Sequence, residues 1–355
     1  MVEVVINHSK KEREDPMEGI TVVGIDLAKN VFEVTGRNSE GRTVVQRSLR
    51  RERFREFISQ LPSTVIGMEA CGGANYWGRL FREMGHEVRL VAPQFVKPYV
   101  KSNKNDRADS EAICEAVTRP HMRFVAVKSL EQQDVLSVHR VRERLIKNRT
   151  VLCNEIRGLL TEYGLVFGQG VSVLRRTLPQ LLEEAENGLT DRIRALIADL
   201  WEELKELEER ITRTNTKIEV EVRASEVCQR LKGVPGVGSL TASAIVASVG
   251  NPNVFKNGRE FSASLGLVPR QHSSGGKERL LGISKRGDGY LRKLLIHGAR
   301  AVLQHLGSKV DPRSEWLRKL EARRGHNRAC VALANKNARI LWVLMARGEK
   351  YRKAA

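Results

Sequence analysis

Four acidic residues occupy positions suited to metal-dependent phosphate chemistry. Asp26 ends the apolar run TVVGI, and Glu69 ends the similar run STVIGM just before a Cys-Gly-Gly turn. Asp106 and Asp109 are three residues apart at the expected start of a helix, so their carboxylates face one side. Clustered carboxylates repel one another unless a cation neutralises them, and hard oxygen ligands suit Mg²⁺ or Mn²⁺. The pattern therefore predicts a metal site of the kind with which nucleases activate water and stabilise a leaving oxygen.

Each of these residues also has a structural interpretation. Asp106 could cap its helix while Asp109 favours the helix dipole, and Glu69 could lie on the surface. Asp26 is harder to explain in this way, because it ends an apolar central strand and faces partial burial. Taken together, the four residues favour catalysis over structure. Three other nearby carboxylates are weaker candidates for the metal site because they do not lie at a predicted strand end: Glu33, Glu111 and Glu115.

A second constellation lies in the glycine-rich segment 269–277, which reads PRQHSSGGK. Its glycines would let a phosphate approach the backbone closely. A serine hydroxyl could attack a phosphodiester if cations stabilise the developing charge, or it could only donate a hydrogen bond to phosphate. The residues themselves leave both roles open. Cations in and after this segment are predicted to hold phosphates: Arg270, Lys277, Arg279, Lys285, Arg286, Arg292 and Lys293.

The segment GVPGVGSLTASAI, which begins at Gly233, has the form of a helix-hairpin-helix. Backbone N–H groups around Gly236 and Gly238 could hold a phosphate without reading its sequence. An ordinary glycine-rich connection between helices is the alternative.

The elements that would position these residues fall into three predicted domains. Residues 20–125 give the order β-β-β-α-β-α-β-α, a mixed sheet covered by helices with the layout of a ribonuclease H-like nuclease fold. Residues 126–225 are predicted to be helical. A heptad stripe from Ile193 to Ile218 indicates a coiled coil, formed within a dimer or as an antiparallel hairpin with the predicted helix Ser129–Gly158, or else a long helix in an intramolecular bundle. Residues 226–355 are predicted to be mostly helical.

Charge and composition limit the kinds of molecule that the protein is expected to bind. The 355 residues carry a net charge of +19, and 25 Lys and Arg against 8 Asp and Glu lie after residue 225, which favours a nucleic-acid surface. No long apolar run or export signal is evident, so we expect a cytoplasmic, nucleoid-associated protein of a bacterium or archaeon without a membrane partner. The five scattered cysteines argue against disulfides or structural zinc.

Both motif sets resemble the DEDD transposases of the IS110 family, which are bridge-RNA-guided insertion-sequence recombinases related to pilin-gene invertases. The first set consists of GIDLAKNVFEV, GMEACGGANYW and NKNDRADSEAI. The second consists of LKGVPGVGSLTASAI and FSASLGLVPRQHSSGGKERLLGISKRGDGYLRKLLIHGARA. Two independent sets in the right order, over nearly the whole chain, make the resemblance specific.

The resemblance implies a RuvC-like nuclease domain whose DEDD set is Asp26, Glu69, Asp106 and Asp109. It also implies a transposase domain with a catalytic serine in a Pro-x-x-x-x-Ser-Gly motif. Counting from Pro269 gives Ser274, with Ser273 in reserve because the two are adjacent. Such enzymes cut and rejoin DNA through a serine–phosphate linkage and a four-way junction, with one protomer's nuclease domain and another's serine domain sharing a composite site.

The expected partners are donor and target DNA, a structured non-coding guide RNA, and further copies of the chain in a dimer or tetramer. Two other hypotheses fit the same residues. The first is a junction-resolving nuclease that uses metal-activated water and does not need Ser274. The second is a non-catalytic DNA- or RNA-binding protein that never cuts.

Overall fold

The computed structural model describes residues 19–100 and 105–352. The chain divides into two compact units, residues 1–129 and 130–355. The first unit ends close to the predicted boundary at residue 125, while the predicted boundary at residue 225 falls inside the second unit and stays a prediction. Positions 101–104 and 353–355 of the predicted domains lie outside the described residues.

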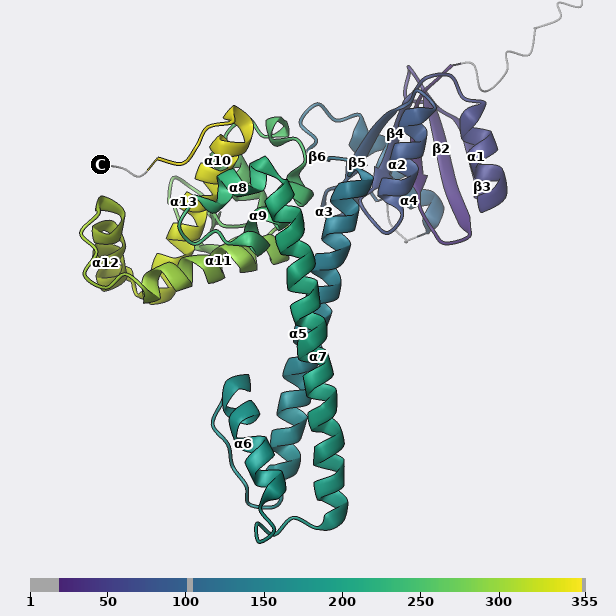
Figure 1. The fold of residues 1–355 in the computed structure, drawn as a ribbon. Helices are drawn as coiled ribbons and strands as arrows, with labels where there is room; N and C mark the ends of the chain where they lie inside the picture. Colours follow the sequence, from purple (N-terminus) through teal and green to yellow (C-terminus); the bar gives the residue numbers. More distant parts are fainter. Residues whose placement is uncertain (1–18, 101–104, 353–355) are drawn as a thin grey trace, which may run out of the picture. The chain divides into compact units, whose positions relative to one another are not determined.

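The first unit is built on a mixed sheet, which in the described part of the chain has six strands in the order β3-β2-β1-β4-β5-β6 (Figure 1). The first three strands form an antiparallel meander, β4 and β5 continue in parallel with β1, and β6 closes the edge antiparallel. The strands are β1 (Ile20–Asp26), β2 (Val31–Asn38), β3 (Thr43–Arg50), β4 (Val65–Glu69), β5 (Glu87–Val91) and β6 (Phe124–Val125).

Helices cover both faces of this sheet. Helices α1 (Arg51–Ser59) and α2 (Ala74–Glu83) pack on one face through an aromatic cluster, in which the Phe32 and Phe54 rings stack 4.2 Å apart. Helix α4 (Asp106–Val117) packs on the other face, against β1, β2 and β4. The predicted mixed sheet covered by helices is confirmed, and the short α3 (Pro93–Val96), η1 (Lys97–Tyr99) and β6 were not predicted.

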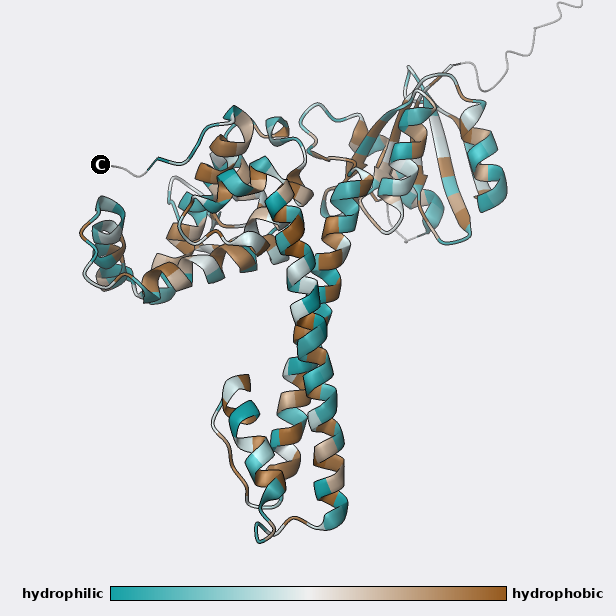
Figure 2. Ribbon diagram, in the orientation of Figure 1, coloured by the Kyte–Doolittle hydropathy of each residue, from teal (hydrophilic) through white to brown (hydrophobic). Residues whose placement is uncertain are grey.

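The second unit begins with a long helical arm. Helix α5 (Leu130–Thr161) lies against α7 (Asp191–Ala224), and α6 (Val171–Glu183) packs at one end of the pair (Figure 1). Hydrophobic residues recur along both α5 and α7 (Figure 2), and buried side chains of the two helices share one hydrophobic core. The heptad positions Leu204, Leu207 and Ile211 are buried there, and Ile218 is buried in the core of the helical module described next. The stripe predicted from the sequence is therefore covered within the chain itself.

The rest of the second unit is a helical module with one core, which the last turns of α7 join through Ile218 and Val222. Apart from the short η2 (Pro252–Val254), its elements are α8 (Glu226–Lys232), α9 (Ser239–Val249), α10 (Gly258–Ser264), β7 (Pro269–Gln271), β8 (Leu280–Ile283), α11 (Gly289–Gln304), α12 (Pro312–Arg324) and α13 (His326–Arg347). A buried histidine, His139 of α5, ties the arm to this module. Its ring nitrogens lie 2.9 Å from the Tyr290 hydroxyl and 3.0 Å from the Ser243 hydroxyl.

Candidate active-site residues

The two strand-end carboxylates share one edge and one face of the sheet. Strands β1 and β4 are parallel, and Ile25 is paired with Met68, so Asp26 and Glu69 are the next residues on each strand. Side chains alternate along a strand, so Asp26 projects on the same face as Gly24, two residues earlier. By the same rule Glu69 projects on the face of Gly67. Both glycines lie under α4, which means both carboxylates are on the α4 side.

Those two glycines set how closely α4 approaches the sheet. A Cβ at Gly24 would clash with the backbone of α4, lying 2.7 Å from the Cys114 nitrogen, and one at Gly67 would lie 2.6 Å from a Val117 methyl carbon. Glycine in a strand interior often marks such a close approach. This signal was present in TVVGIDLA and STVIGMEA, and sequence reasoning missed it.

Two further contacts hold α4 in place. The Thr35 and Ser110 hydroxyls are hydrogen-bonded at 2.8 Å in the buried interface. Asn105 caps the helix, its side chain accepting a 2.7 Å hydrogen bond from the Ala108 backbone. Because Asn105 is the cap, Asp106 and Asp109 are in the first turn and Asp106 is not needed as an N-cap.

Three of the four predicted carboxylates converge. Carboxylate oxygens of Asp26, Asp106 and Asp109 all lie within 4.8 Å of one another. Asp26 and Asp109 are half-buried, while Asp106 is exposed. Among the described residues, these three form the group of acidic, histidine or cysteine side chains whose ligand atoms are close enough to share a cation. Glu69 does not belong to this group.

Glu69 nevertheless lies near the same place. Partial burial, followed by the negative charges of Glu69 and Asp26, raises the pKa of the Cys71 thiol. Both carboxylates therefore act on one side chain at the end of β4. A three-oxygen set with a fourth carboxylate nearby fits a hard divalent cation.

The carboxylates that the sequence ranked lower are engaged elsewhere. Glu33 accepts a hydrogen bond from the Ser48 hydroxyl, and Glu111 accepts one of 2.8 Å from the Gln46 amide. Glu115 pairs with Arg37 at 2.8 Å and with Arg119. Their partners are structural, which agrees with their lower rank.

The glycine-rich serine segment forms the tip of a β-hairpin in the second unit. Strands β7 and β8 pair antiparallel, and the Lys277 nitrogen donates a 3.1 Å hydrogen bond to the Ser274 carbonyl. Gly275 and Gly276 have φ of 57° and 74°, as a two-residue type I′ turn requires. The segment 269–282 is exposed throughout.

The two adjacent serines differ in their hydrogen bonds. The Ser273 hydroxyl accepts hydrogen bonds from the Gln271 amide at 3.0 Å and the Arg279 backbone at 3.2 Å. In the described part of the chain no such bond involves the Ser274 hydroxyl. Ser273 therefore braces the hairpin, and Ser274 presents its hydroxyl at the turn.

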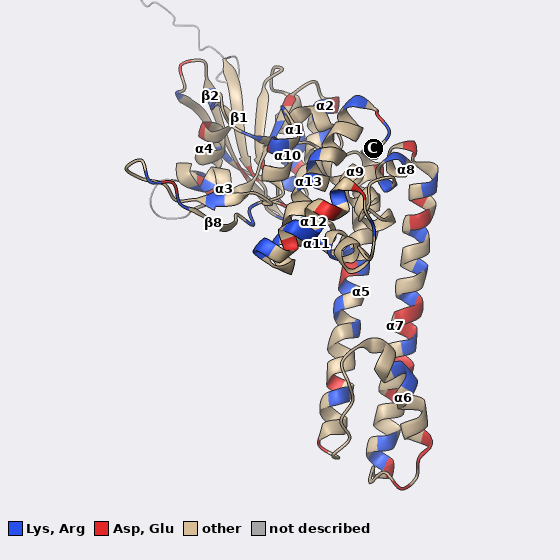
Figure 3. Ribbon diagram, turned by 90° about the vertical axis from the view of Figure 1, so that its left-hand side faces the viewer, with Lys and Arg blue, Asp and Glu red and all other residues tan. Residues whose placement is uncertain are grey.

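The predicted phosphate-binding cations divide into two groups. Five are exposed on or beside the hairpin: Arg270, Lys277, Arg279, Lys285 and Arg286. Two are engaged within the unit. Arg292 donates a 2.8 Å hydrogen bond to the Leu265 carbonyl, and Lys293 pairs with Glu143. Lys and Arg residues, blue in Figure 3, recur along α11, α12 and α13.

The two predicted helix-hairpin-helix glycines also differ. Gly236 has φ of 86°, and an added Cβ would lie 2.8 Å from the Gly298 carbonyl of α11. That close approach requires glycine whether or not a phosphate binds. Gly238 precedes α9, and nothing lies within 4 Å of an added Cβ. Phosphate binding at both positions remains a prediction.

A sheet domain with carboxylates clustered at the end of β1 and the start of α4, followed by a basic helical unit, fits a metal-dependent DNA-processing enzyme. Residues 228–315 match the family described as "Transposase IS116/IS110/IS902 family", and residues 23–165 match the DEDD transposase family of IS110 type.

Similar proteins cover almost the whole chain. "Transposase for insertion sequence element IS1111A" of Coxiella burnetii is 50% identical over 97% of this chain and 95% of its own length. "Probable family 20 transposase" of Pseudomonas aeruginosa is 53% identical over 93% of this chain and 98% of its own. "Transposase for insertion sequence element IS1328" of Yersinia enterocolitica is 38% identical over 95% and 100%.

The chain belongs to the IS110/IS116/IS902 family of insertion-sequence transposases, enzymes that cleave and join DNA. The DEDD type of the family implies use of a divalent metal, in agreement with the acidic cluster. No helix in the described ranges is both long and apolar enough to cross a membrane.

Proposed function

We propose that this transposase cuts and rejoins DNA with the Ser274 hydroxyl as nucleophile and with Asp26, Glu69, Asp106 and Asp109 as ligands of Mg²⁺ or Mn²⁺. The observation that carries the proposal is the convergence of Asp26, Asp106 and Asp109 within 4.8 Å on the α4 face of the sheet. The exposed Ser274 hydroxyl at a glycine turn supports the serine role.

In the proposed step the Ser274 oxygen forms a bond to the scissile phosphorus, and the bond from phosphorus to a deoxyribose oxygen breaks. The serine gives up its proton and the leaving oxygen takes one. One phosphoester replaces another, so rejoining by the reverse step needs no external energy source. A bound divalent cation would stabilise the charge that develops on the phosphate oxygens. Arg270, Lys277, Lys285 and Arg286 hold neighbouring phosphates, and Arg279, Arg292, Lys293 and the Gly236–Gly238 backbone are further candidate contacts.

Finer features of the family extend the proposal. The strand order and the antiparallel first three strands support a RuvC-like assignment of the first unit. The buried α5–α7 seam supports an antiparallel coiled-coil arm. We further propose that a structured guide RNA selects donor and target DNA, and that protomers of a dimer or tetramer share a composite site. Sequencing the nucleic acid that copurifies with the protein tests the RNA partner.

Paired serine variants test the reaction. Ser274→Ala should abolish strand cleavage and exchange, whereas Ser273→Ala should retain both at a reduced level, because it only removes two hydrogen bonds that brace the hairpin. Cleavage of labelled donor DNA in Mg²⁺ measures both. The reverse ranking would make Ser273 the nucleophile.

A junction-resolving nuclease is the second candidate function. It is favoured by one observation: no side chain in the described residues is hydrogen-bonded to the Ser274 hydroxyl to act as its base. Full cleavage by Ser274→Ala, together with loss of cleavage by Asp26→Asn, would establish metal-activated water as the nucleophile.

A further inference from the structure

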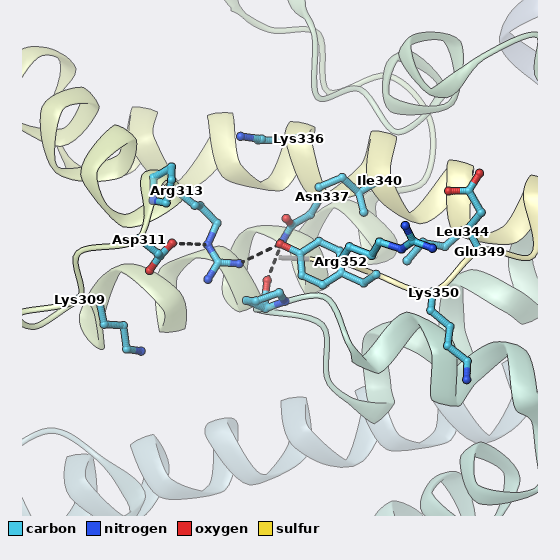
Figure 4. Close-up of a pocket in the computed structure, with 13 residues that line it drawn as sticks. Lys309, Asp311, Arg313, Lys336, Asn337, Ile340, Leu344, Glu349, Lys350 and Arg352 are labelled. Carbon is cyan, nitrogen blue, oxygen red and sulfur yellow. Dashed lines mark hydrogen bonds and ion pairs between the residues drawn. The ribbon is translucent and has the colours of Figure 1, made fainter. Parts of the chain in front are cut away.

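A cavity of about 970 Å³ lies in the second unit, away from the serine hairpin. Its walls come from the start of α12, one side of α13, the α8–α9 turn at Pro235, and the segment that follows α13 (Figure 4). This volume is at the upper end of the range for small-ligand sites, about 300–1000 Å³.

The lining carries more positive than negative charge. Five cations line it: Lys309, Arg313, Lys336, Lys350 and Arg352. The two lining acids are already engaged. Asp311 caps α12 and accepts a 2.6 Å hydrogen bond from the Ser314 hydroxyl, the main cause of the lowered pKa of its carboxyl. Glu349 lies 3.8 Å from Arg347. Five cations against two acids leave the lining with a net positive charge, which an anion entering the cavity would meet.

One of these cations is fixed in the wall. The Arg313 Nε lies 4.0 Å from the Asp311 carboxylate, and a terminal nitrogen of the guanidinium donates a 3.4 Å hydrogen bond to the Tyr351 hydroxyl. These two contacts hold the guanidinium at the cavity wall without saturating its five N–H donors. Lys336 is also held, its ammonium 4.8 Å from the centre of the Trp316 ring.

The floor of the cavity is apolar. Ile340 and Leu344 of α13, labelled in Figure 4, line it. The half-buried Tyr351 also lines the cavity and packs against the same hydrophobic core. A bare inorganic anion would gain nothing from contact with such an apolar surface. A nucleotide has both parts: a phosphate for the cations and a flat base for the apolar and aromatic surface.

We infer that this cavity binds one phosphodiester and its nucleoside from a single-stranded nucleic-acid segment. A duplex carries its bases stacked inside and cannot enter a cavity of this size, whereas a single strand can turn one nucleotide inward. RNA and single-stranded DNA share this chemistry. The inference does not depend on Ser274 as nucleophile.

The test measures binding of the full-length protein, freed of nucleic acid, to fluorescent ten-nucleotide oligouridine and oligothymidine in EDTA. The test variant is Lys350→Glu with Arg352→Glu, at the exposed rim. The matched control is Lys319→Glu with Arg323→Glu, which makes the same charge change on exposed residues of α12 outside the cavity.

We expect the rim variant to weaken binding of at least one strand about tenfold and to lower the salt slope by about 1.4, as loss of two phosphate contacts requires. The control should stay within about twofold. Comparing oligouridine with oligothymidine then shows whether the cavity prefers RNA or single-stranded DNA. Equal weakening by the two variants would reduce the effect to general electrostatics and overturn the inference. So would displacement by duplex DNA, or by polyglutamate of matched charge, as effectively as by a single strand. EDTA removes metal-dependent cleavage, so these outcomes leave the proposed reaction untouched.

Discussion

The acidic cluster and the serine hairpin are built in opposite ways. Asp26 stands at the end of β1, and Asp106 and Asp109 stand on α4, which packs against the sheet at Gly24 and Gly67 and is fixed by a buried Thr35–Ser110 hydrogen bond. The hairpin is exposed over residues 269–282, and its geometry is set by a two-glycine turn and a few backbone hydrogen bonds. The proposed metal ligands are thus prepositioned by packing, while the proposed serine nucleophile lies on a surface element.

This difference indicates how the two sites divide the work. Prepositioned carboxylates can hold charge without reorganisation during the reaction. An exposed serine without a hydrogen-bonded base depends on groups brought to it by DNA or by another site. The predictions below compare how much activity or stability is lost when the residues that hold each site in place are changed.

The largest effect is expected at the carboxylates. Asp26→Asn or Asp109→Asn should lower strand exchange by about 10³-fold or more, because each removes a charged ligand from the trio. DNA binding should persist, since the basic second unit is unchanged. Activity and DNA affinity are measured side by side, with Glu111→Gln on the same helix as the control. Loss of binding together with activity would indicate a folding role instead.

The next largest effect is expected at Gly24, where α4 packs against the sheet beside the acidic cluster. Gly24→Ala should destabilise the first unit by about 1–3 kcal/mol, because its Cβ would overlap the backbone of α4. Activity should fall with it as Asp106 and Asp109 shift. Urea unfolding measures the change, and Gly19→Ala, where nothing lies within 4 Å of an added Cβ, is the control. An unchanged transition would show that the close packing does not position the site.

The turn of the hairpin should tolerate asparagine better than valine. Gly276 has φ of 74°, which costs a β-branched residue about 1–2 kcal/mol, whereas Asn adopts this region more readily. Gly276→Val should therefore lower strand exchange about tenfold, and Gly276→Asn should lower it less. Equal activity of the two variants would mean that the turn does not set the position of Ser274.

The smallest effect concerns the joint between α5 and the module that carries the hairpin. Burial, and secondarily the charge of Arg142, lowers the pKa of His139 to about 4. Unfolding lets this histidine take up a proton below pH 6.5, so the stability it contributes is present above that pH and is lost as pH falls towards 4. The slope should be at most about 1.4 kcal/mol per pH unit.

The control for that joint is His139→Gln, whose amide can hydrogen-bond without titrating. Unfolding of the second unit, followed from pH 7.5 to 4, should depend less on pH in the variant than in the wild-type chain. Identical pH profiles would show that protonation of His139 does not oppose the folded joint.

The sequence predicted β1 and β4 well because each is a short apolar run that ends in an acidic residue. Asp26 and Glu69 could be paired because strand ends identify them, and Asp106 and Asp109 because helix spacing does. The heptad stripe predicted a buried seam, but its partner is set by the chain's return through α6, which spacing alone does not determine.

What could not be predicted depends on contacts between distant segments. Arg292 donates a hydrogen bond to the Leu265 carbonyl, 27 residues away, which its place in the motif does not indicate. Ser273 and Ser274 are equivalent in the motif and differ only through the hydrogen bonds of the folded hairpin. Gly236 must be glycine because the backbone of Gly298, on another helix, leaves no room for a Cβ atom. Each role is decided by a partner that local spacing does not reveal.

The central claim, a serine nucleophile served by a separate metal site, is tested most directly by trapping the covalent intermediate. A nicked or gapped donor DNA that prevents rejoining is incubated with wild-type protein, guide RNA and Mg²⁺, and the protein–DNA adduct is digested and mapped by mass spectrometry. Our account predicts a phosphate ester on Ser274, absent in the Asp26→Asn variant. Efficient cleavage with no adduct on any serine would contradict it and show that water is the nucleophile.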